Sequence, residues 1–505
     1  MLSKIRSDVC CMTAEALDVV RVLLRYPFLE MKVLLIYPPQ SPCAIAPSNF
    51  EPLALEVLAS TIPNHEVTVF DMRFETLSAL EHVIQARDFD LAGISVNNTI
   101  QVNPAKNLLQ RIRTWDPRMV LVVGGHHPTV HPVDFYETYV DAIFTGWAEK
   151  SFPQFVSLWQ EGIQPKNLPG VLLIINGRPA SNGNSASGLN QSDIPHPDRS
   201  VAARYTKNYR DEFGRRTALV NTARGCPFRC SFCSCWRFSS GRYMVRKAGE
   251  VFREIAEIPD FVGRVFFADD NTFQDLHRAE ILYQLIRDSG IKKKYSGYCR
   301  ADTIVKKPEL FRKWQSIGLD NLTVGFEAIS EENLKRLNKS GHTETNRQAV
   351  ALLNEAGLKY RAYFLIDPVF QKKDFAKISQ YIEKLNIPRP MFVVLTPLPG
   401  TELYEIKKPA IDRSYDYFDF VHWVEPPCMG EEEFYRQFRK IYYRAYSLKR
   451  YLRAILRDAL GILGMKQKAT SWPHVSLPEL IKLRVIAWLI SRRLHRFAVS
   501  QKPPS

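Results

Sequence analysis

Two series of short apolar runs determine which folds this chain can adopt. Helical patterns separate the runs within each series. The runs of the first series are rich in Val, Ile and Leu and largely continuous, which is typical of parallel strands buried on both faces. The first series comprises residues 32–37, 66–71, 91–96, 119–125, 141–146 and 170–175, and the second 217–222, 264–269, 294–299, 321–326, 359–366 and 391–396. The sequence therefore predicts an α/β protein.

The two series predict two consecutive domains. Residues 31–175 are expected to form an open, doubly wound parallel sheet, whose ligands bind beyond the carboxyl ends of the strands. Residues 176–205, rich in Gly, Ser, Asn and Pro, are expected to be a linker. The six strand–helix units within 206–430 predict a partial (β/α) barrel with its active face at the strand carboxyl ends. Residues 431–505 are expected to form a helical C-terminal region.

The N-terminal extension, residues 1–30, has no secretory signal pattern. Because Met31 opens the first predicted strand, we expect the extension to be a mis-called start or a short peripheral helix.

Composition narrows the class of protein. Nine cysteines in 505 residues are too few for a disulfide scaffold, so a reducing, cytoplasmic compartment is expected. No apolar run free of charge is long enough to cross a bilayer.

The formal net charge of +15 is concentrated at the C-terminus, where residues 440–505 carry fourteen lysines and arginines but only Asp458 and Glu479. A nucleic-acid surface would spread its charge over the folded body, so no nucleic-acid partner is expected. Cations mixed with Leu, Ile and Trp are typical of helices at a membrane interface. A peripheral membrane contact through this tail is therefore predicted, and a solvated basic face is the alternative.

Four cysteines, Cys226, Cys230, Cys233 and Cys235, fall within ten positions directly after the first strand of the second series. They are too dense and too close to arginines to be ordinary core residues. A structural zinc site usually takes two pairs of ligands separated by a spacer, and no second pair is present. The CxxxCxxC spacing of the first three favours an iron–sulfur cluster with one iron left free for another ligand. The fourth is expected to pack against Trp236.

This motif, on a loop that opens a series of strand–helix units, resembles the radical S-adenosylmethionine (SAM) enzymes. The resemblance implies a 4Fe-4S cluster held by Cys226, Cys230 and Cys233, with SAM bound at the free iron. It further implies SAM contacts from the strand ends that follow. The residues in those positions are Asp269, Asp270, Asn271, Arg300 and Glu327.

The first domain resembles that of the cobalamin-binding radical SAM methyltransferases through "MKVLLIYPP", "GISVNNT" and "VVGGHHPT". The Asp-x-His-x-x-Gly motif that usually ligates cobalt is absent, and the loop of residues 95–98 stands in its place. The resemblance implies that cobalamin is bound by Ser95, Asn97, Gly124, Gly125 and Gly146. Two histidines, His126 and His127, are expected at the edge of the cavity rather than as metal ligands.

The layout of nearly the whole chain resembles the hopanoid C-3 methylase group. The resemblance implies a C-methyltransferase that moves a methyl group from SAM, through cobalamin, to an unactivated carbon of a hopanoid or other lipid-like small molecule. It also implies a flavodoxin- or ferredoxin-like electron donor. The stretch "HWVEPPCMG" (422–430) departs from the group's pattern and is expected to close the substrate side. The alternatives are a radical SAM oxidative cyclase or rearrangement enzyme with the same cofactors, and a non-catalytic cobalamin or redox sensor.

Overall fold

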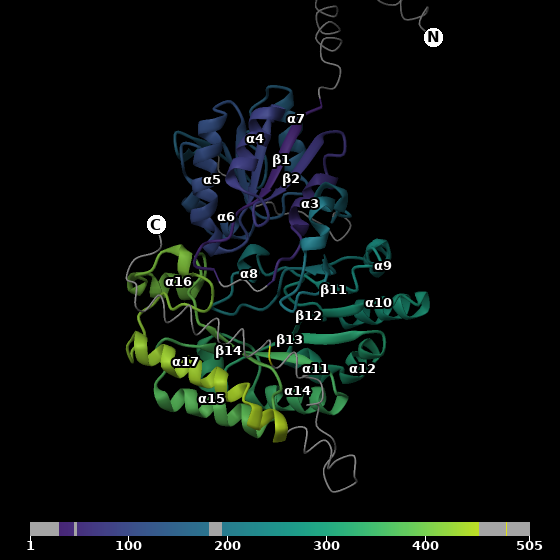
Figure 1. Ribbon diagram of the computed structural model, residues 1–505, viewed down its shortest axis with the longest axis vertical. Helices are drawn as coiled ribbons and strands as arrows, with labels where there is room; N and C mark the ends of the chain where they lie inside the picture. The colour runs from purple at the N-terminus through teal and green to yellow at the C-terminus, as the bar shows by residue number, and fades with distance from the viewer. Residues whose placement is uncertain (1–29, 45–47, 181–193, 454–480, 482–505) are drawn as a thin grey trace, which may run out of the picture.

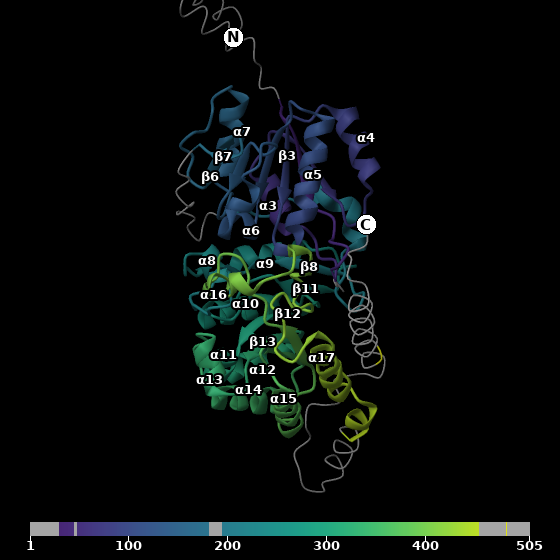
Figure 2. The same cartoon turned by 90° about the vertical axis from the view of Figure 1, so that its left-hand side faces the viewer.

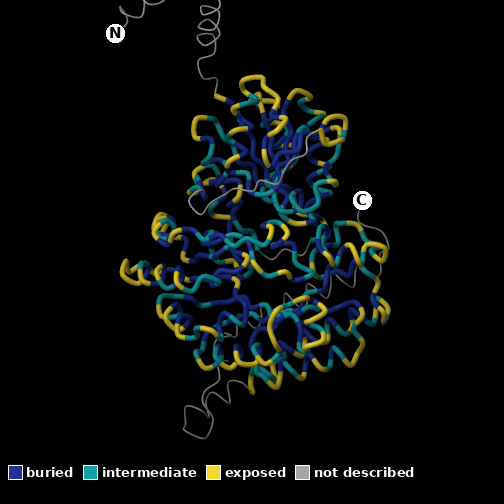
Figure 3. Tube along the Cα trace, turned by 180° about the vertical axis from the view of Figure 1, so that it is seen from behind, coloured by how far each residue is buried: buried dark blue, intermediate teal, exposed yellow. Residues whose placement is uncertain are grey.

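The structure is a computed structural model that describes residues 30–44, 48–180, 194–453 and 481. It consists of two α/β units, one above the other along the long axis of the molecule (Figure 1). Buried residues form separate cores around the two sheets (Figure 3). The predicted extension, 1–30, lies outside the described residues except for its last residue, and the predicted C-terminal helices lie outside them beyond residue 453.

The first unit is built on a seven-stranded sheet with the order β2-β1-β3-β4-β5-β6-β7. Its first five strands are parallel, as predicted. They are β1 (Lys32–Tyr37), β2 (Glu66–Asp71), β3 (Leu91–Ser95), β4 (Val120–Gly124) and β5 (Ala142–Phe144).

The last two strands correct the prediction, because β6 (Val171–Ile175) and β7 (Arg178–Pro179) run antiparallel to their neighbours. Strand β6 returns to the sheet edge beside β5, and the two-residue turn at Asn176 and Gly177 then reverses the chain into β7. Both turn residues have positive φ, which suits a tight hairpin.

Helices cover both faces of this sheet, which is why its strands are continuously apolar. Helices α4 (Leu77–Arg87) and α5 (Val102–Trp115) pack on one face. Helices α3 (Leu53–Ser60) and α7 (Ser151–Gln160) pack on the other. The short helix α6 (His126–Val130) follows β4 at the carboxyl end of the sheet.

The second unit confirms the predicted partial barrel. Its six strands are all parallel, in the order β15-β14-β13-β12-β11-β8. They are β8 (Thr217–Val220), β11 (Arg264–Phe267), β12 (Lys294–Arg300), β13 (Leu319–Glu327), β14 (Tyr360–Ile366) and β15 (Pro390–Val394). The covering helices include α9 (Ala248–Glu257), α10 (Leu276–Ser289), α12 (Pro308–Ser316), α14 (Thr343–Ala356) and α15 (Lys372–Lys384).

Local signals set the helix boundaries. The Asp275 side chain accepts a hydrogen bond from the backbone N–H of Arg278 and so caps the start of α10. Glycines with positive φ, Gly290 and Gly357, end α10 and α14.

Small elements join the two units (Figure 2). A two-stranded hairpin, β9 (Ala223–Arg224) with β10 (Met244–Val245), encloses the cysteine loop and helix α8 (Cys235–Phe238). The predicted linker holds β7 and most of a 3-10 segment, η5 (Arg199–Asn208), which packs against β2 and α3. The carboxyl ends of the two sheets consequently face one another across the boundary, since shared cavities are lined from both sides.

The predicted C-terminal helix is present as α17 (Glu431–Ala445), which packs on α15. The described helices include none that is both long and apolar enough to span a membrane.

Candidate functional site

The cysteine loop is anchored by Asp269, at the end of β11. Its carboxylate accepts hydrogen bonds from the backbone N–H of Thr222 at 2.6 Å, the Thr222 hydroxyl at 2.5 Å and the backbone N–H of Ala223 at 2.9 Å. Burial raises the pKa of Asp269. Because both carboxylate oxygens are engaged within the protein, the geometry favours a positioning role for Asp269 over direct contact with SAM.

Gly225, immediately before the first cysteine, has a φ of 81°. A Cβ there would collide with the Arg242 carbonyl and the Ser239 side chain. The chain therefore requires glycine to pass between the hairpin and α8. Trp236 further braces the loop by donating from its indole nitrogen to the Cys230 carbonyl at 2.9 Å.

The arrangement of the cysteines does not suit a single zinc ion. In the described part of the chain, the one group of three or more ligand atoms within 4.8 Å of one another is His127, His131 and Asp134. The cysteine sulfurs therefore do not converge on one ion, as a tetrahedral zinc site would require. Burial raises the pKa of Cys226 to about 11, so this thiol must lose its proton when it binds metal.

The prediction that Cys235 packs against Trp236 was wrong. The two residues are neighbours on α8, so their side chains leave the helix in different directions. The Cys235 thiol instead hydrogen-bonds to Cys233, which lowers the pKa of Cys233, and it lines the main cavity with Asp270.

Asn271 presents an unused acceptor to this cavity. Its side-chain nitrogen donates to Gln274 at 2.9 Å, while its Oδ1 atom is buried and has no partner among the described residues. The neighbouring Asp270 is exposed and lines both cavities of the site. This loop therefore offers an unpaired carbonyl oxygen and a carboxylate to a ligand that carries N–H donors.

Glu327, at the end of β13, adopts a left-handed backbone with a φ of 63°. The register of β13 against β14 shifts at this point, and the Glu327 carboxylate turns back over Gly325 to accept from the Lys339 ammonium at 3.1 Å. Irregular backbone of this kind is common beside functional sites, where it redirects a side chain. Lys339 was not predicted, because no motif surrounds it in the sequence.

Arg300 reaches the cysteine loop from the end of β12. Its guanidinium carbon lies 3.5 Å from the centroid of the Phe228 ring, which belongs to that loop. The same guanidinium donates to the Asp302 carboxylate and to the Ser340 carbonyl. Arg300 therefore clamps the loop in place rather than presenting a free cation.

A cavity of about 690 Å³ unites these groups. The three cysteines and all five predicted SAM residues line it. Much of the remaining wall is aromatic and aliphatic, with side chains that include Phe50, Phe266, Tyr298, Leu395, Phe418 and Phe420. The predicted closing stretch, 422–430, does not contribute to this lining. His422 is instead buried and bonded to Asp419, so residues 418–420 bound the cavity.

A second cavity, of about 290 Å³, lies at the carboxyl end of the first sheet. All five predicted cobalamin residues line it, and small residues make up part of its wall, namely Gly93, Gly124, Gly125, Gly146, Ala54 and Ala148. Gly125 has a φ of 112°, and a Cβ on it would lie 2.7 Å from the Val96 carbonyl oxygen. At these glycines, a ligand can approach the backbone of the first unit closely.

The two cavities adjoin, since Asn97, His126, Ala268 and Asp270 line both. The His126 ring lies within hydrogen-bonding distance of the Ser234 hydroxyl, at 2.7 Å, and Ser234 stands between two cysteines of the loop. Burial lowers the pKa of His126.

An ion pair also crosses the boundary, between Arg224 beside the cysteine loop and Glu149 of the first unit. These contacts were not predicted, because they join residues far apart in sequence. His127 lines the cavity edge, as predicted, where Asp134 and Thr99 hold its ring.

Comparison with known proteins decides the family. A model of the radical SAM superfamily matches residues 220–382, and a model of the B12 binding domain matches residues 43–156. Hopanoid C-3 methylase of Methylococcus capsulatus is 26% identical to the chain over 446 residues, which is 86% of this chain and 84% of that protein. The chain belongs to the cobalamin-dependent radical SAM methyltransferase family. It is therefore an enzyme.

The relatives of this chain also include enzymes that are not named methyltransferases. An anaerobic magnesium-protoporphyrin IX monomethyl ester cyclase of Rubrivivax gelatinosus is 26% identical over 380 residues, covering 70% of this chain and 65% of that protein. The fold is that of the radical SAM methyltransferase TsrM from Kitasatospora setae, solved with cobalamin and a [4Fe-4S] cluster bound. That similarity has a TM-score of 0.64 at 18% sequence identity and covers 93% of this chain and all of the other.

The cofactors of the family are a 4Fe-4S cluster, SAM and cobalamin. The residues of this chain fit them. Among the described residues, the three thiols lie on one loop without converging on a single ion, the buried Asn271 oxygen has no donor, and Gly124, Gly125 and Gly146 line the second cavity.

Proposed function

We propose that this enzyme transfers a methyl group from SAM, by way of cobalamin, to an unactivated carbon of an apolar, lipid-like molecule. The observation that carries the proposal is the cavity of about 690 Å³, which the three cysteines line together with many aromatic and aliphatic side chains. An apolar cavity of this size buries most of a large hydrophobic ligand. The adjoining glycine-walled cavity puts a second cofactor within reach of the same space.

The cysteine end of the cavity is assigned to the cluster and SAM. Cys226, Cys230 and Cys233 hold the cluster. Asn271 and Asp270 accept from the SAM ammonium group, which supplies the donors that the buried Asn271 oxygen lacks. Glu327 faces the cavity from β13 and accepts from the SAM ribose, as carboxylates at strand ends do for ribose hydroxyls.

Cobalamin is assigned to the glycine-walled cavity. Ser95 is the last residue of β3 and Asn97 follows it, Gly124 is the last residue of β4 and Gly125 follows it, and Gly146 follows β5. Asn97 donates to the Ser95 hydroxyl at 3.1 Å, so the two side chains form one polar edge. These residues bind the cofactor by shape and hydrogen bonding.

Together, these cofactors supply the radical chemistry and the methyl carrier, as cofactors do in such enzymes. The task of the chain is to position them and to keep water out. Asp269 and Arg300 hold the cysteine loop in place, and Phe418 and Phe420 add apolar surface to the same cavity. A dry cavity also protects reactive species from side reactions.

A hopanoid or related lipid is the substrate class that fits these walls, and a flavodoxin- or ferredoxin-like protein would supply the electrons. A lipid substrate places the enzyme at the inner face of a membrane. The tail predicted to make that contact lies outside the described residues beyond residue 453.

The test is anaerobic reconstitution with SAM labelled in its methyl group and a lipid extract. We expect labelled methyl in a lipid that has gained one methylene in mass. The matched control is Cys233→Ala, which should abolish the product. An extract compound that loses hydrogens, with SAM cleaved and no label incorporated, would show a cyclase or another oxidative enzyme instead.

A further inference from the structure

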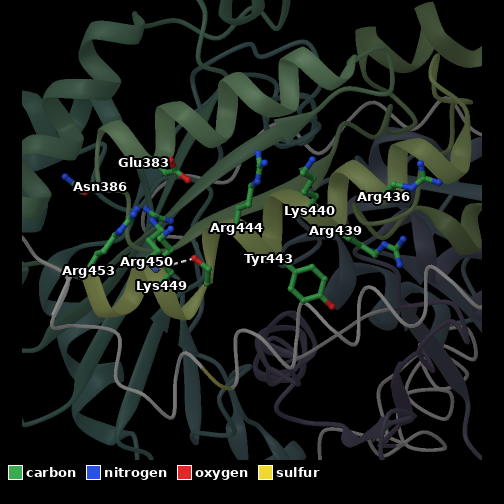
Figure 4. A pocket seen from close by; sticks show the side chains of 11 residues that line it. Glu383, Asn386, Arg436, Arg439, Lys440, Tyr443, Arg444, Lys449, Arg450 and Arg453 are labelled. Atoms are coloured by element: carbon green, nitrogen blue, oxygen red, sulfur yellow. Dashed lines mark hydrogen bonds between the residues drawn. The ribbon is translucent and has the colours of Figure 1, made fainter. Parts of the chain in front are cut away.

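A dense group of cations surrounds a groove far along the chain from the cysteine loop. Helix α17, the end of α15 and residues 447–453 form this groove, which has a volume of about 630 Å³. Seven cations line it, against the single carboxylate of Glu383 (Figure 4). They are Arg436, Arg439, Lys440, Arg444, Lys449, Arg450 and Arg453.

Most of this charge is not neutralised by acidic side chains of the described residues. Arg436 pairs with Glu432 and Glu433, and Arg450 donates to backbone carbonyls that include those of Ile382 and Ile387. The remaining five cations form no ion pair with any acidic side chain of the described residues.

Three of these cations are spaced so that their positive charges repel one another. Arg436, Lys440 and Arg444 lie four residues apart along one stripe of α17, and like charges at this spacing destabilise a helix. The described structure therefore tolerates an unfavourable concentration of charge, which a bound anion would relieve.

The surface beside the groove is apolar. Leu448 and Leu452 are 46% and 54% exposed and lie one helical turn apart, and Tyr443 is 43% exposed on the groove wall. Exposed leucines and a tyrosine next to a row of cations are typical of a segment that lies in a membrane interface. A nucleic-acid backbone would use the cations but gives no role to the two leucines.

We propose that this groove binds the headgroup phosphates of anionic phospholipids, with Leu448 and Leu452 inserted among the acyl chains. The proposal assigns membrane contact to described residues of the folded body, and it is independent of the reaction that the enzyme catalyses. The basic chain beyond residue 453 contains only Asp458 and Glu479 as acids, so it has little negative charge with which to occupy the groove itself.

The test is flotation of the reconstituted holoenzyme with vesicles of phosphatidylcholine alone or mixed with phosphatidylglycerol. We expect flotation only with the anionic vesicles, weakened by salt. The variant Lys440→Glu/Arg444→Glu/Arg453→Glu should lower the partition coefficient at least about a hundredfold, because each cation near an anionic surface contributes roughly fivefold. Leu448→Ser/Leu452→Ser should weaken binding while leaving its salt dependence in place.

The matched control is Arg118→Glu/Lys292→Glu/Lys335→Glu, which changes the net charge equally at exposed sites away from the groove. It should float like the parent protein. Circular dichroism and iron content show whether each variant is folded. The proposal is overturned if the parent protein ignores anionic vesicles, if the groove variant floats as well as the control, or if oligonucleotides bind more tightly than vesicles. Since flotation measures no catalysis, its failure leaves the proposed methyl transfer standing.

Discussion

Replacing Asp269 by alanine tests whether this buried carboxylate builds the cluster site. The substitution leaves the backbone N–H groups of Thr222 and Ala223 buried without an acceptor. Each such loss costs about 1 to 3 kcal/mol, and the removal of a buried carboxylate offsets part of it. The same burial that raises the pKa of Asp269 makes its charged carboxylate costly in the folded state, and alanine removes this cost. We expect a net destabilisation of about 2 to 4 kcal/mol, concentrated in the cysteine loop.

The assay is iron and sulfide content per chain after anaerobic reconstitution, together with thermal unfolding followed by circular dichroism. Asp269→Ala should bind less than half the iron of the parent and unfold roughly 5 to 15 °C lower, because 1 kcal/mol shifts a unit of this size by about 2 to 4 °C.

The matched control is Asp269→Asn. In the parent, both backbone N–H groups donate to one oxygen, Oδ1, which asparagine retains. Its amide nitrogen would replace Oδ2 and donate to the Thr222 hydroxyl. Asp269→Asn should therefore keep most of its iron. If alanine binds as much iron as the parent, or asparagine loses as much as alanine, the hydrogen-bonding argument is refuted.

Three further predictions concern other parts of the molecule. Gly225→Ala should abolish cluster incorporation, measured as iron content, whereas Gly241→Ala, which also has positive φ but meets open space, should retain it. Glu56→Gln tests a pH dependence. Burial raises the pKa of Glu56 well above its ordinary value of 4.5, so the folded protein keeps a proton that the unfolded chain loses. The stability that this proton contributes is complete below pH 4.5 and is lost as the pH rises. The melting temperature of Glu56→Gln, relative to that of the parent, should therefore be higher at pH 8 than at pH 5. The same difference in melting temperature at the two pH values would contradict this. Phe420→Ala should lower kcat/KM for the lipid by about tenfold to a hundredfold, because an apolar contact with the lipid is lost. The rate of SAM cleavage in the absence of lipid should stay unchanged. An equal loss in methyl transfer and in SAM cleavage would argue against a substrate contact.

Most of the fold could be predicted from the sequence, because strands buried on both faces of a sheet are apolar over several consecutive residues. The run 119–125 and residues 33–36 of the run 32–37 are apolar throughout, and both became central parallel strands. The direction of β6 was not predictable, since a buried run reads alike in parallel and antiparallel sheets.

The site was predictable where chemistry demands a fixed spacing, as in the three cysteines of one loop. It was not predictable where partners are distant in sequence. Glu149 and Arg224 meet across the two units, and Lys339 meets Glu327 across a loop. Even within the cysteine motif, the contacts of Cys235 were not predictable, because the direction of its side chain depends on where α8 begins.

The proposed function requires that the two adjoining cavities hold the cofactors and share one apolar substrate space. Its most direct test is mass spectrometry of lipids incubated anaerobically with the reconstituted enzyme, a reductant, cobalamin and methyl-labelled SAM. Methyl transfer through cobalamin predicts a labelled lipid that is heavier by one methylene. This product should be absent without cobalamin and absent with Cys233→Ala. Cleavage of SAM at a normal rate without label in any lipid would contradict it.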